Sequence, residues 1–441
     1  MKKSISIDQE AMNSNFQQEK TRRIYRIGID ARFFNLENKG LGRYTYELVR
    51  WLDKLNYQKI KTKKKLSIDN PVNLEYYIFL RQKDWSLFQP KSPNFYKVLA
   101  DYRWYSWSEQ LLFPFLLRKY KLDLVHFPHF NVPLFYRQRF LVTIHDLILF
   151  HFPTYQNSRL SKLFYYLKLA AYHLIIRSTV RRAAKIIAIS NFTAMDLLES
   201  FNLPAAKVKV IYNGVNFEYV DKSGKSNKSA KLAKQSKSQI SSICKKYGII
   251  KPYFLYAGSA FPHKNLTRLV KAFKPFSRNY QLVLLGSNDY FYRRLKEIIH
   301  REKISGVVIT GHLNQKELDL FYRQAKLFIF PSLYEGFGLP PLEALGRKVP
   351  VISSDRASLP EVLGDKVRYF NPEKVKDIQR AIKQSLVEPL VIDDLELEKL
   401  KKRFVWKKMA QRIQKEYIRL LQKETKNRKE KPCQLSHLTK E

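Results

Sequence analysis

One short stretch of the chain concentrates residues that could bind an anionic, polyhydroxylated ligand. It covers residues 331–344, with the sequence PSLYEGFGLPPLEA. Gly336 and Gly338 let the backbone approach a ligand closely, because they carry no side chain. Pro340 and Pro341 favour the start of a helix, whose free amides and positive dipole attract an anion. The segment therefore predicts a diphosphate-binding turn.

Two glutamates flank this turn, Glu335 and Glu343, with seven residues between them. Carboxylates make strong hydrogen bonds to hydroxyl groups, so the pair could hold two polyols, such as a hexose and a ribose. An alternative is that Glu343 only stabilises the helix N-terminus through its charge, worth about 1 kcal/mol or less. Taken alone, the residues favour this second interpretation of Glu343.

A lysine and a histidine follow expected strands. Lys264, in the sequence PHKN, comes after a strand and a glycine, and Asn265 begins the next helix. His145 follows the apolar run FLVTI, at the end of a strand where open α/β sheets bind ligands. The alternatives are a solvated surface lysine and a structural histidine, since His126, His129 and His151 lie close by in the sequence.

The elements that must position these residues form two series of strands alternating with helices. Such alternation predicts an α/β protein with two Rossmann-like, doubly wound parallel domains facing across a cleft. The expected strands of the first series are residues 26–30, 76–80, 122–127, 140–144, 185–189 and 208–212. Those of the second series are residues 253–257, 281–285, 307–310, 327–330 and 349–353.

Composition sets the expected boundaries between these domains. A lysine- and serine-rich tract at residues 221–242 lacks the apolar content to fold, and predicts a linker. Apolar residues at helical spacing from Trp406 to Leu420 predict a closing amphipathic helix. The predicted segments are an N-terminal extension (1–23), a first domain (24–216), a linker (217–250), a second domain (251–403), the closing helix (404–422) and a basic, disordered tail (423–441).

The motif EGFGLPPLEA resembles the signature of retaining glycosyltransferases of family 4. Other stretches resemble the same family in the right order: GLGRYTYEL, VTIHDL, IIAISNFTAMDLL, VKVIYNGVN, YFLYAGSAFPHKNLTRLVKAF, LVLLGS, TGHL, LPEVLGD and FVWKKMA. The resemblance spans residues 26–420. It implies a GT-B fold, an acceptor bound by the first domain (24–216) and a nucleotide sugar bound by the second. It also implies no metal or other cofactor, and a closing helix that crosses back onto the first domain.

The resemblance also implies roles for individual residues. Glu335 would lie beside the donor hexose, Glu343 would hold the ribose hydroxyls, and Lys264 would bind the diphosphate. His145 would face the donor sugar. Other expected substrate contacts are Gly40 and Gly42 in a glycine-rich loop, the amides of Phe337, Gly338 and Leu339, and Gly311, His312 and Leu313 beside the nucleobase.

The chain departs from the family pattern at three positions and in the linker insertion. Ser259, expected at the substrate, and His263 stand where many relatives carry arginine. The diphosphate would then depend more heavily on Lys264, which predicts weaker donor binding. Lys348 replaces a frequent glycine away from the expected chemistry.

The net charge of +42 predicts attraction to anions. Nucleic acid, anionic lipid and a phosphorylated substrate all fit this charge, and so does a genome biased toward lysine codons.

The N-terminus lacks the apolar run of a secretory signal, and no run of apolar residues is long enough to span a bilayer. Two distant cysteines indicate neither a disulfide framework nor a metal site, so the cytoplasm is the expected compartment. Residues 159–185 predict either a helix lying on anionic lipid or a core helix with a basic edge.

The predicted activity is transfer of a hexose from a nucleotide sugar to a polysaccharide or lipid-linked glycan, with mannose ahead of glucose by family habit alone. One alternative is a synthase acting on a soluble sugar. Two others belong to different classes: a basic protein that binds nucleic acid, and a non-catalytic scaffold of the same fold. No nucleic-acid recognition motif is present, so nucleic acid is not an expected partner.

Overall fold

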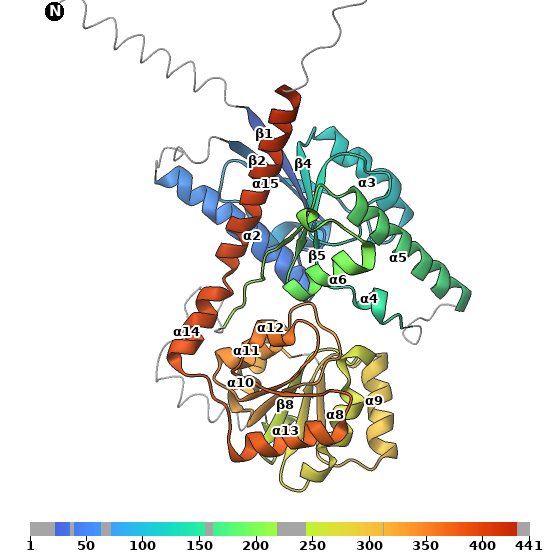
Figure 1. Ribbon diagram of the computed structural model, residues 1–441, viewed down its shortest axis with the longest axis vertical. Helices are drawn as coiled ribbons and strands as arrows, with labels where there is room; N and C mark the ends of the chain where they lie inside the picture. The colour runs from blue at the N-terminus through green and yellow to red at the C-terminus, as the bar shows by residue number, and fades with distance from the viewer. Residues whose placement is uncertain are drawn as a thin grey trace, which may run out of the picture. The chain divides into compact units, whose positions relative to one another are not determined.

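The computed structural model describes residues 23–35, 39–62, 72–154, 162–217, 244–311 and 313–429. The predicted N-terminal extension up to residue 22, the lysine- and serine-rich tract, and the tail beyond residue 429 lie outside these ranges. The chain divides into two compact units (Figure 1). Unit 1 takes in residues 1–143, 175–187 and 406–441, and unit 2 takes in residues 144–174 and 188–405. The finer boundaries given above remain a proposal.

The first sheet has seven strands among the described residues, in the order β3-β2-β1-β4-β5-β6-β7. The printed register makes β3, β2, β1, β4 and β5 parallel neighbours. The strands are β1 (Ile24–Asp30), β2 (Asn73–Leu80), β3 (Phe95–Leu99), β4 (Leu124–Phe127), β5 (Phe140–Ile144), β6 (Lys185–Ala188) and β7 (Val208–Val210). Its helices are α2 (Lys39–Lys61), α3 (Trp107–Lys119), α4 (Ile148–His151), α5 (Lys162–Arg182) and α6 (Asn191–Phe201).

The second sheet has six described strands, all parallel, in the order β10-β9-β8-β11-β12-β13. The strands are β8 (Tyr253–Ala257), β9 (Gln281–Leu285), β10 (Val307–Gly311), β11 (Leu327–Phe330), β12 (Val351–Ser354) and β13 (Arg368–Phe370). The helices are α8 (Leu266–Phe273), α9 (Tyr290–Arg301), α10 (Gln315–Gln324), α11 (Leu339–Gly346), α12 (Leu359–Leu363), α13 (Val375–Val387) and α14 (Asp394–Arg403).

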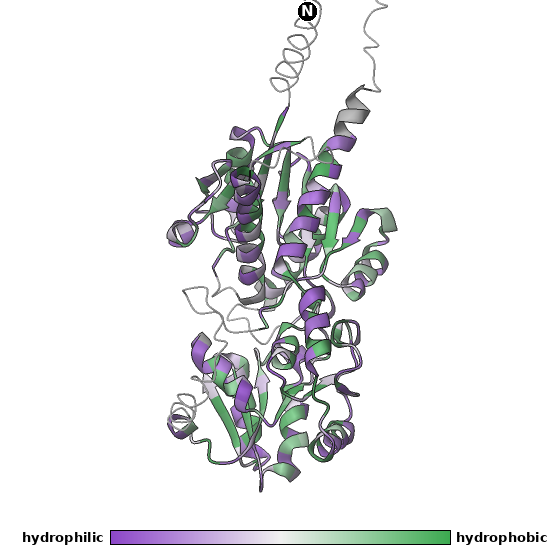
Figure 2. Cartoon of the chain, turned by 90° about the vertical axis from the view of Figure 1, so that its left-hand side faces the viewer, coloured by the Kyte–Doolittle hydropathy of each residue, from purple (hydrophilic) through white to green (hydrophobic). Residues whose placement is uncertain are grey.

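Both sheets are apolar because helices cover them. Every residue of β5, β8, β9 and β11 is buried, as expected for parallel strands covered on both faces. Figure 2 shows hydrophobic strands and helices with one polar side. The predicted pair of doubly wound domains is confirmed, although the short strands β3 and β13 were not expected.

The closing helix is α15 (Trp406–Lys429), and it packs against α2 within unit 1. Its apolar residues Trp406, Met409, Ile413 and Tyr417 are all buried. The Tyr417 hydroxyl is hydrogen-bonded to Nδ1 of His126, at 2.6 Å. The helix therefore crosses back onto the first sheet's unit, as the resemblance implied.

Two local expectations were wrong. α2 begins at Lys39, so Gly40 and Gly42 lie in its first turn and not in a loop before it. A glycine is tolerated there because the first amides of a helix have no intrahelical partner to lose. α15 continues to Lys429, so the first residues of the predicted disordered tail are helical.

The basic segment at residues 159–185 contains α5, which is buried on one side and exposed near its start. Its residues Tyr172, Ile176 and Val180 are buried, as in a core helix. Leu163 and Tyr166, near its start, are exposed. Among the described residues, no helix has the length and apolarity needed to cross a membrane.

Candidate functional site

The loop after β8 is fixed against the loop after β11 by main-chain and amide hydrogen bonds. Asn265 adopts a left-handed conformation, with φ of 60°. Its side-chain amide donates to the carbonyl oxygens of Pro331, at 3.1 Å, and Pro372, at 2.7 Å. The amide of Leu333 donates to the carbonyl oxygen of His263, at 2.7 Å. Lys264, between these anchors, is thereby held beside the Glu335 loop.

The loop from β11 to α11 carries Glu335 and the two glycines. The Ser358 hydroxyl donates to the carbonyl oxygen of Glu335, at 2.9 Å. Gly338, the residue before α11, has φ of 85°, a conformation that favours glycine. A β-carbon there would lie 2.7 Å from Cδ2 of Leu359. The helix begins at Leu339 and carries prolines in its first turn, which confirms the expected start.

Lys264 and Glu335 meet directly. Nζ of Lys264 donates to Oε1 of Glu335 at 2.5 Å, and the two side chains are only 16% and 10% exposed. An ammonium and a carboxylate withdrawn from water are strongly coupled. The pair places one donor and one acceptor of opposite charge at the amino end of α11.

The loop after β5 packs against the same turn. A β-carbon on Gly336 would lie 1.9 Å from the main-chain oxygen of His145. The Ser190 hydroxyl donates to the carbonyl oxygen of Gly336 at 2.8 Å, and the Thr193 hydroxyl lies 3.4 Å from that of His145. His145 directly follows β5 of the first sheet, but it belongs to unit 2 and its main chain lies against Gly336.

Tyr334 joins these loops to α6. Its hydroxyl donates to Oδ2 of Asp196 and accepts the amide of Leu147 at 3.3 Å. The other carboxylate oxygen of Asp196 lies 2.8 Å from Nε2 of His151. Burial and the Asp196 carboxylate raise the pKa of Tyr334, so the hydroxyl stays protonated and remains a donor.

The site also shifts the pKa of two neighbouring groups. Burial raises the pKa of Asp146 above its ordinary value, and the Glu335 carboxylate adds to the shift, while the Ile148 amide and Lys264 oppose it. Burial, and then the charge of Lys264, lowers the pKa of His263 to about 4. His263 is therefore neutral at pH 7, and Lys264 supplies the positive charge of that loop.

Glu343 lies on α11 and is buried, at 8% exposure. The Tyr322 hydroxyl lies 3.5 Å from its Oε2, at the limit of a hydrogen bond. Arg347, one helical turn further, donates to the Glu343 carbonyl at 2.8 Å and to Asp319 at 2.7 Å. A carboxylate that only compensated the helix dipole would be expected in contact with water, so the burial of Glu343 does not fit that alternative.

The other predicted substrate contacts lie on several different elements. Ser259 follows β8, and Gly311 ends β10 with φ of 81°. Leu313 is half-buried, and His312 lies outside the described residues. Phe337 is buried next to Gly338. Gly40 and Gly42 belong to unit 1, and their expected contact with the substrate stays a prediction.

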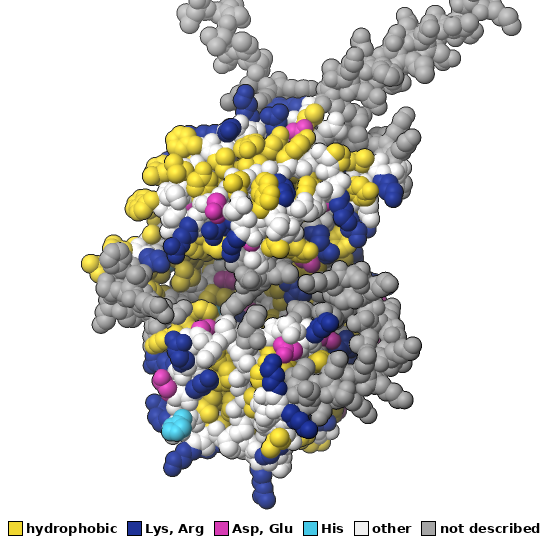
Figure 3. Space-filling view, turned by 180° about the vertical axis from the view of Figure 1, so that it is seen from behind, with side chains coloured by type: hydrophobic (Ala, Val, Ile, Leu, Met, Phe, Trp, Pro, Cys, Tyr) yellow, Lys and Arg dark blue, Asp and Glu magenta, His cyan; other side chains and the backbone are white. Residues whose placement is uncertain are grey.

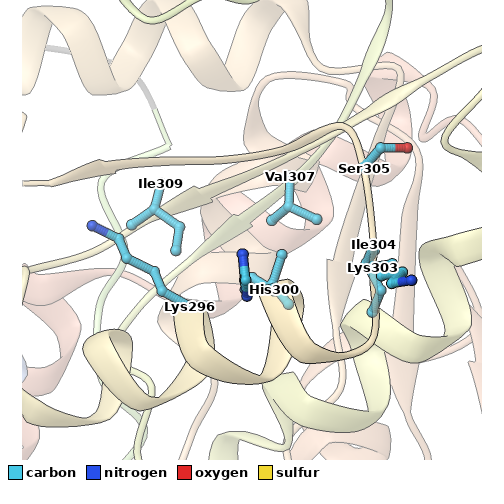
Figure 4. A pocket seen from close by; sticks show the side chains of 8 residues that line it. Lys296, His300, Lys303, Ile304, Ser305, Val307 and Ile309 are labelled. Atoms are coloured by element: carbon cyan, nitrogen blue, oxygen red, sulfur yellow. The ribbon is translucent and has the colours of Figure 1, made fainter.

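A separate hollow lies between α9 and the edge strand β10, with a volume of about 570 Å³. Figure 4 shows Lys296, His300 and Lys303 around it, and Val307 and Ile309 from the strand. None of the predicted site residues lines it. Within the described ranges, no three histidine, cysteine, aspartate or glutamate side chains are grouped to hold a metal ion.

Two family models match the chain in succession. Residues 73–219 match "Glycosyltransferase Family 4", and residues 243–406 match "Glycosyl transferases group 1". The chain belongs to glycosyltransferase family 4. The second match contains Lys264, Glu335 and Glu343, and the first contains His145.

Individual relatives of this family 4 glycosyltransferase agree with the assignment. The O-antigen chain mannosyltransferase RfbU of Salmonella typhimurium is 28% identical over 282 residues, covering 64% of this chain and 69% of RfbU. Sucrose-phosphate synthase from Thermosynechococcus elongatus has a TM-score of 0.66 at 17% identity, covering 90% of this chain and 100% of the synthase. Anabaena HepE in complex with UDP and glucose has a TM-score of 0.61 at 14% identity, covering 90% of this chain and 99% of HepE. The two solved structures establish the GT-B fold.

Sequence reasoning did not single out Tyr334, Asp196, Asp146 or Ser190. Tyr334 and Asp146 are direct neighbours of Glu335 and His145, which was a usable signal. Asp196 has the spacing of an ordinary surface residue on a helix, and only its contact with Tyr334 makes it relevant.

Proposed function

We propose that this family 4 enzyme is a retaining, metal-independent hexosyltransferase. It transfers mannose, ahead of glucose, from a nucleotide sugar to a polysaccharide or lipid-linked glycan. The observation that carries the proposal is the contact between Lys264 and Glu335 at the amino end of α11. A cation, a carboxylate and free helix amides together match the diphosphate and hydroxyl groups of a nucleotide sugar.

In this proposal each residue acts on one part of the donor. Lys264 and the amides of Gly338 and Leu339 hold the diphosphate and stabilise the charge that develops as it leaves. When the donor enters, the Lys264 ammonium exchanges one carboxylate oxygen for phosphate oxygens. Glu335 then accepts hydrogen bonds from hexose hydroxyls, and Glu343 from the ribose.

Retention follows from attack on the face of the sugar that the diphosphate leaves. The glycosidic bond to phosphate breaks through an oxocarbenium-like transition state, and the departing phosphate accepts the proton of the attacking hydroxyl. No enzyme nucleophile is needed. His145, held at the same turn, positions the hexose, so the residues work by orientation and electrostatics.

Mannose is supported by the name of RfbU, an O-antigen chain mannosyltransferase. A nucleotide-sugar donor, with its base left for experiment to identify, is supported by the UDP and glucose bound to HepE, whose fold this chain shares. A lipid-linked acceptor would place the enzyme peripherally at the inner membrane face. The high positive charge of the chain is consistent with that location.

A donor screen tests the proposal. Release of nucleoside diphosphate is measured for GDP-mannose, UDP-glucose, UDP-galactose, UDP-N-acetylglucosamine and ADP-glucose, with EDTA present. Release from GDP-mannose that disappears in Glu335→Ala is expected. Absence of release and of calorimetric binding with every donor would refute the enzyme proposal, and a different productive donor would refute mannose.

A further inference from the structure

The outer side of α3 in unit 1 exposes large apolar residues. Trp107, Leu111 and Phe115 recur every four residues, so they lie along one side of the helix. Their exposed fractions are 81%, 46% and 65%, and that of the adjacent Leu112 is 52%. The opposite side of the helix packs into the core, where Phe113 and Leu117 are buried. We call these four exposed side chains the α3 apolar face.

Basic residues border this face. Arg118 and Lys119, in the last turn of α3, are exposed, and the Arg118 guanidinium lies 5.6 Å from the Phe115 ring centre. The adjoining loop adds Phe135, 52% exposed, and Arg137, also exposed. This loop is fixed to the helix, since the Leu134 amide donates to Gln110 at 2.9 Å.

Acidic residues are nearly absent from the segments around the α3 apolar face. Residues 102–122 contain one, Glu109, which is buried and paired with Arg32 at 2.8 Å. Residues 124–145 and 175–187 contain none. The flanking Asp101 and Asp123 are paired with Arg81 and Arg23, at 3.0 and 2.8 Å. From behind, unit 1 shows broad hydrophobic areas bordered by lysine and arginine, with few acidic side chains (Figure 3).

From this pattern we propose that the α3 apolar face inserts into the headgroup region of an anionic lipid surface. A tryptophan and other large apolar residues beside arginine and lysine match the boundary between acyl chains and negative headgroups. A second copy of the chain fits less well, because two such basic surfaces would repel. This proposal rests on the proposed function in one respect: lipid binding would bring the enzyme to a lipid-linked acceptor.

Co-sedimentation with vesicles tests the proposal with the full chain and no sugar substrate. One set of vesicles contains one part phosphatidylglycerol to two parts phosphatidylcholine, and the other contains phosphatidylcholine alone. The test variant combines Trp107→Ser, Leu111→Ser and Phe115→Ser. The matched control combines Ile250→Ser, Val387→Ser and Leu395→Ser, three exposed apolar residues of unit 2.

Binding to the anionic vesicles is expected for the natural chain and the control, with a loss of at least about tenfold in the test variant. A second variant, Arg118→Gln with Lys119→Gln, should lose roughly fivefold per charge on anionic vesicles only. Equal binding of test variant and natural chain would overturn the proposal. So would equal binding to both vesicle types, or a dimer that the test variant dissociates in sedimentation. Donor release measured alongside separates the two proposals, because the test variant should keep it whatever the lipid result.

Discussion

The main-chain oxygen of His145 occupies the space that a side chain on Gly336 would need, only 1.9 Å from the site of a β-carbon. The two residues are 191 positions apart, and both flank the Lys264 and Glu335 pair within unit 2. The clashing atom belongs to the main chain, so the clash cannot be relieved by a change of side-chain rotamer. The approach of the two loops therefore depends on a glycine at position 336.

Gly336→Ala should separate these loops and reduce kcat by about 100-fold or more, since small displacements of reacting groups are costly. The free energy of unfolding should fall by about 1–3 kcal/mol. Steady-state kinetics and urea unfolding measure the two effects. Gly364→Ala is the control: its φ is 68°, and no atom lies within 4 Å of the added carbon. It should lose about 1 kcal/mol of stability and keep its activity. Normal kcat in Gly336→Ala would contradict the role of this contact.

Removing the cation from the Lys264 and Glu335 pair should destabilise the protein. Lys264→Met leaves the carboxylate of Glu335 without its 2.5 Å partner in a mostly buried position, at an expected cost of about 3 kcal/mol. Adding Glu335→Gln should restore part of that stability, because the unpaired charge is then gone. Urea unfolding of both single variants and the double variant gives the coupling energy. Strict additivity would show that the two groups do not interact.

Tyr334→Phe should lower kcat about tenfold with less effect on KM. The change removes the hydroxyl that Asp196 and the Leu147 amide share, and so releases the His145 loop from α6. Losing these two hydrogen bonds at a mostly buried position should cost about 1–2 kcal/mol of stability, although Asp196 keeps its contact with His151. Tyr369→Phe removes a similar hydroxyl bond, to the Gly364 carbonyl at 2.6 Å, and should not change kcat. An equal loss of kcat in both variants would indicate a general effect on stability.

His263 should make the protein less stable in acid. Burial and Lys264 lower its pKa from 6.5 to about 4, so the folded state binds fewer protons than the unfolded state between these values. The free energy of unfolding is therefore unaffected by the titration of His263 above pH 6.5. It falls by up to about 3 kcal/mol as the pH drops from 6.5 to about 4. His263→Gln should flatten this part of the profile of unfolding free energy against pH. An unchanged slope would show that His263 is not buried as a neutral base.

The sequence alone predicted the two parallel α/β units and the start of the helix after the Glu335 loop. Strands such as β8, β9 and β11 were placed at their observed bounds, because continuous apolar runs between turns have few other interpretations. The prolines after Gly338 fixed the start of α11, since proline favours the first helical turn. Short or mixed segments were harder: β3 and β13 were missed, and the first turn of α2 was mistaken for a loop.

Only the tertiary structure decided which side chains meet. It paired Lys264 with Glu335, seated the carbonyl of His145 against Gly336, and joined Tyr334 to Asp196 across 138 positions of sequence. The apolar pattern of α3 likewise did not distinguish its buried side from its exposed one. Sequence patterns report local preference and periodicity, whereas these contacts depend on how separate strands align their carboxyl ends, which packing of the whole unit sets.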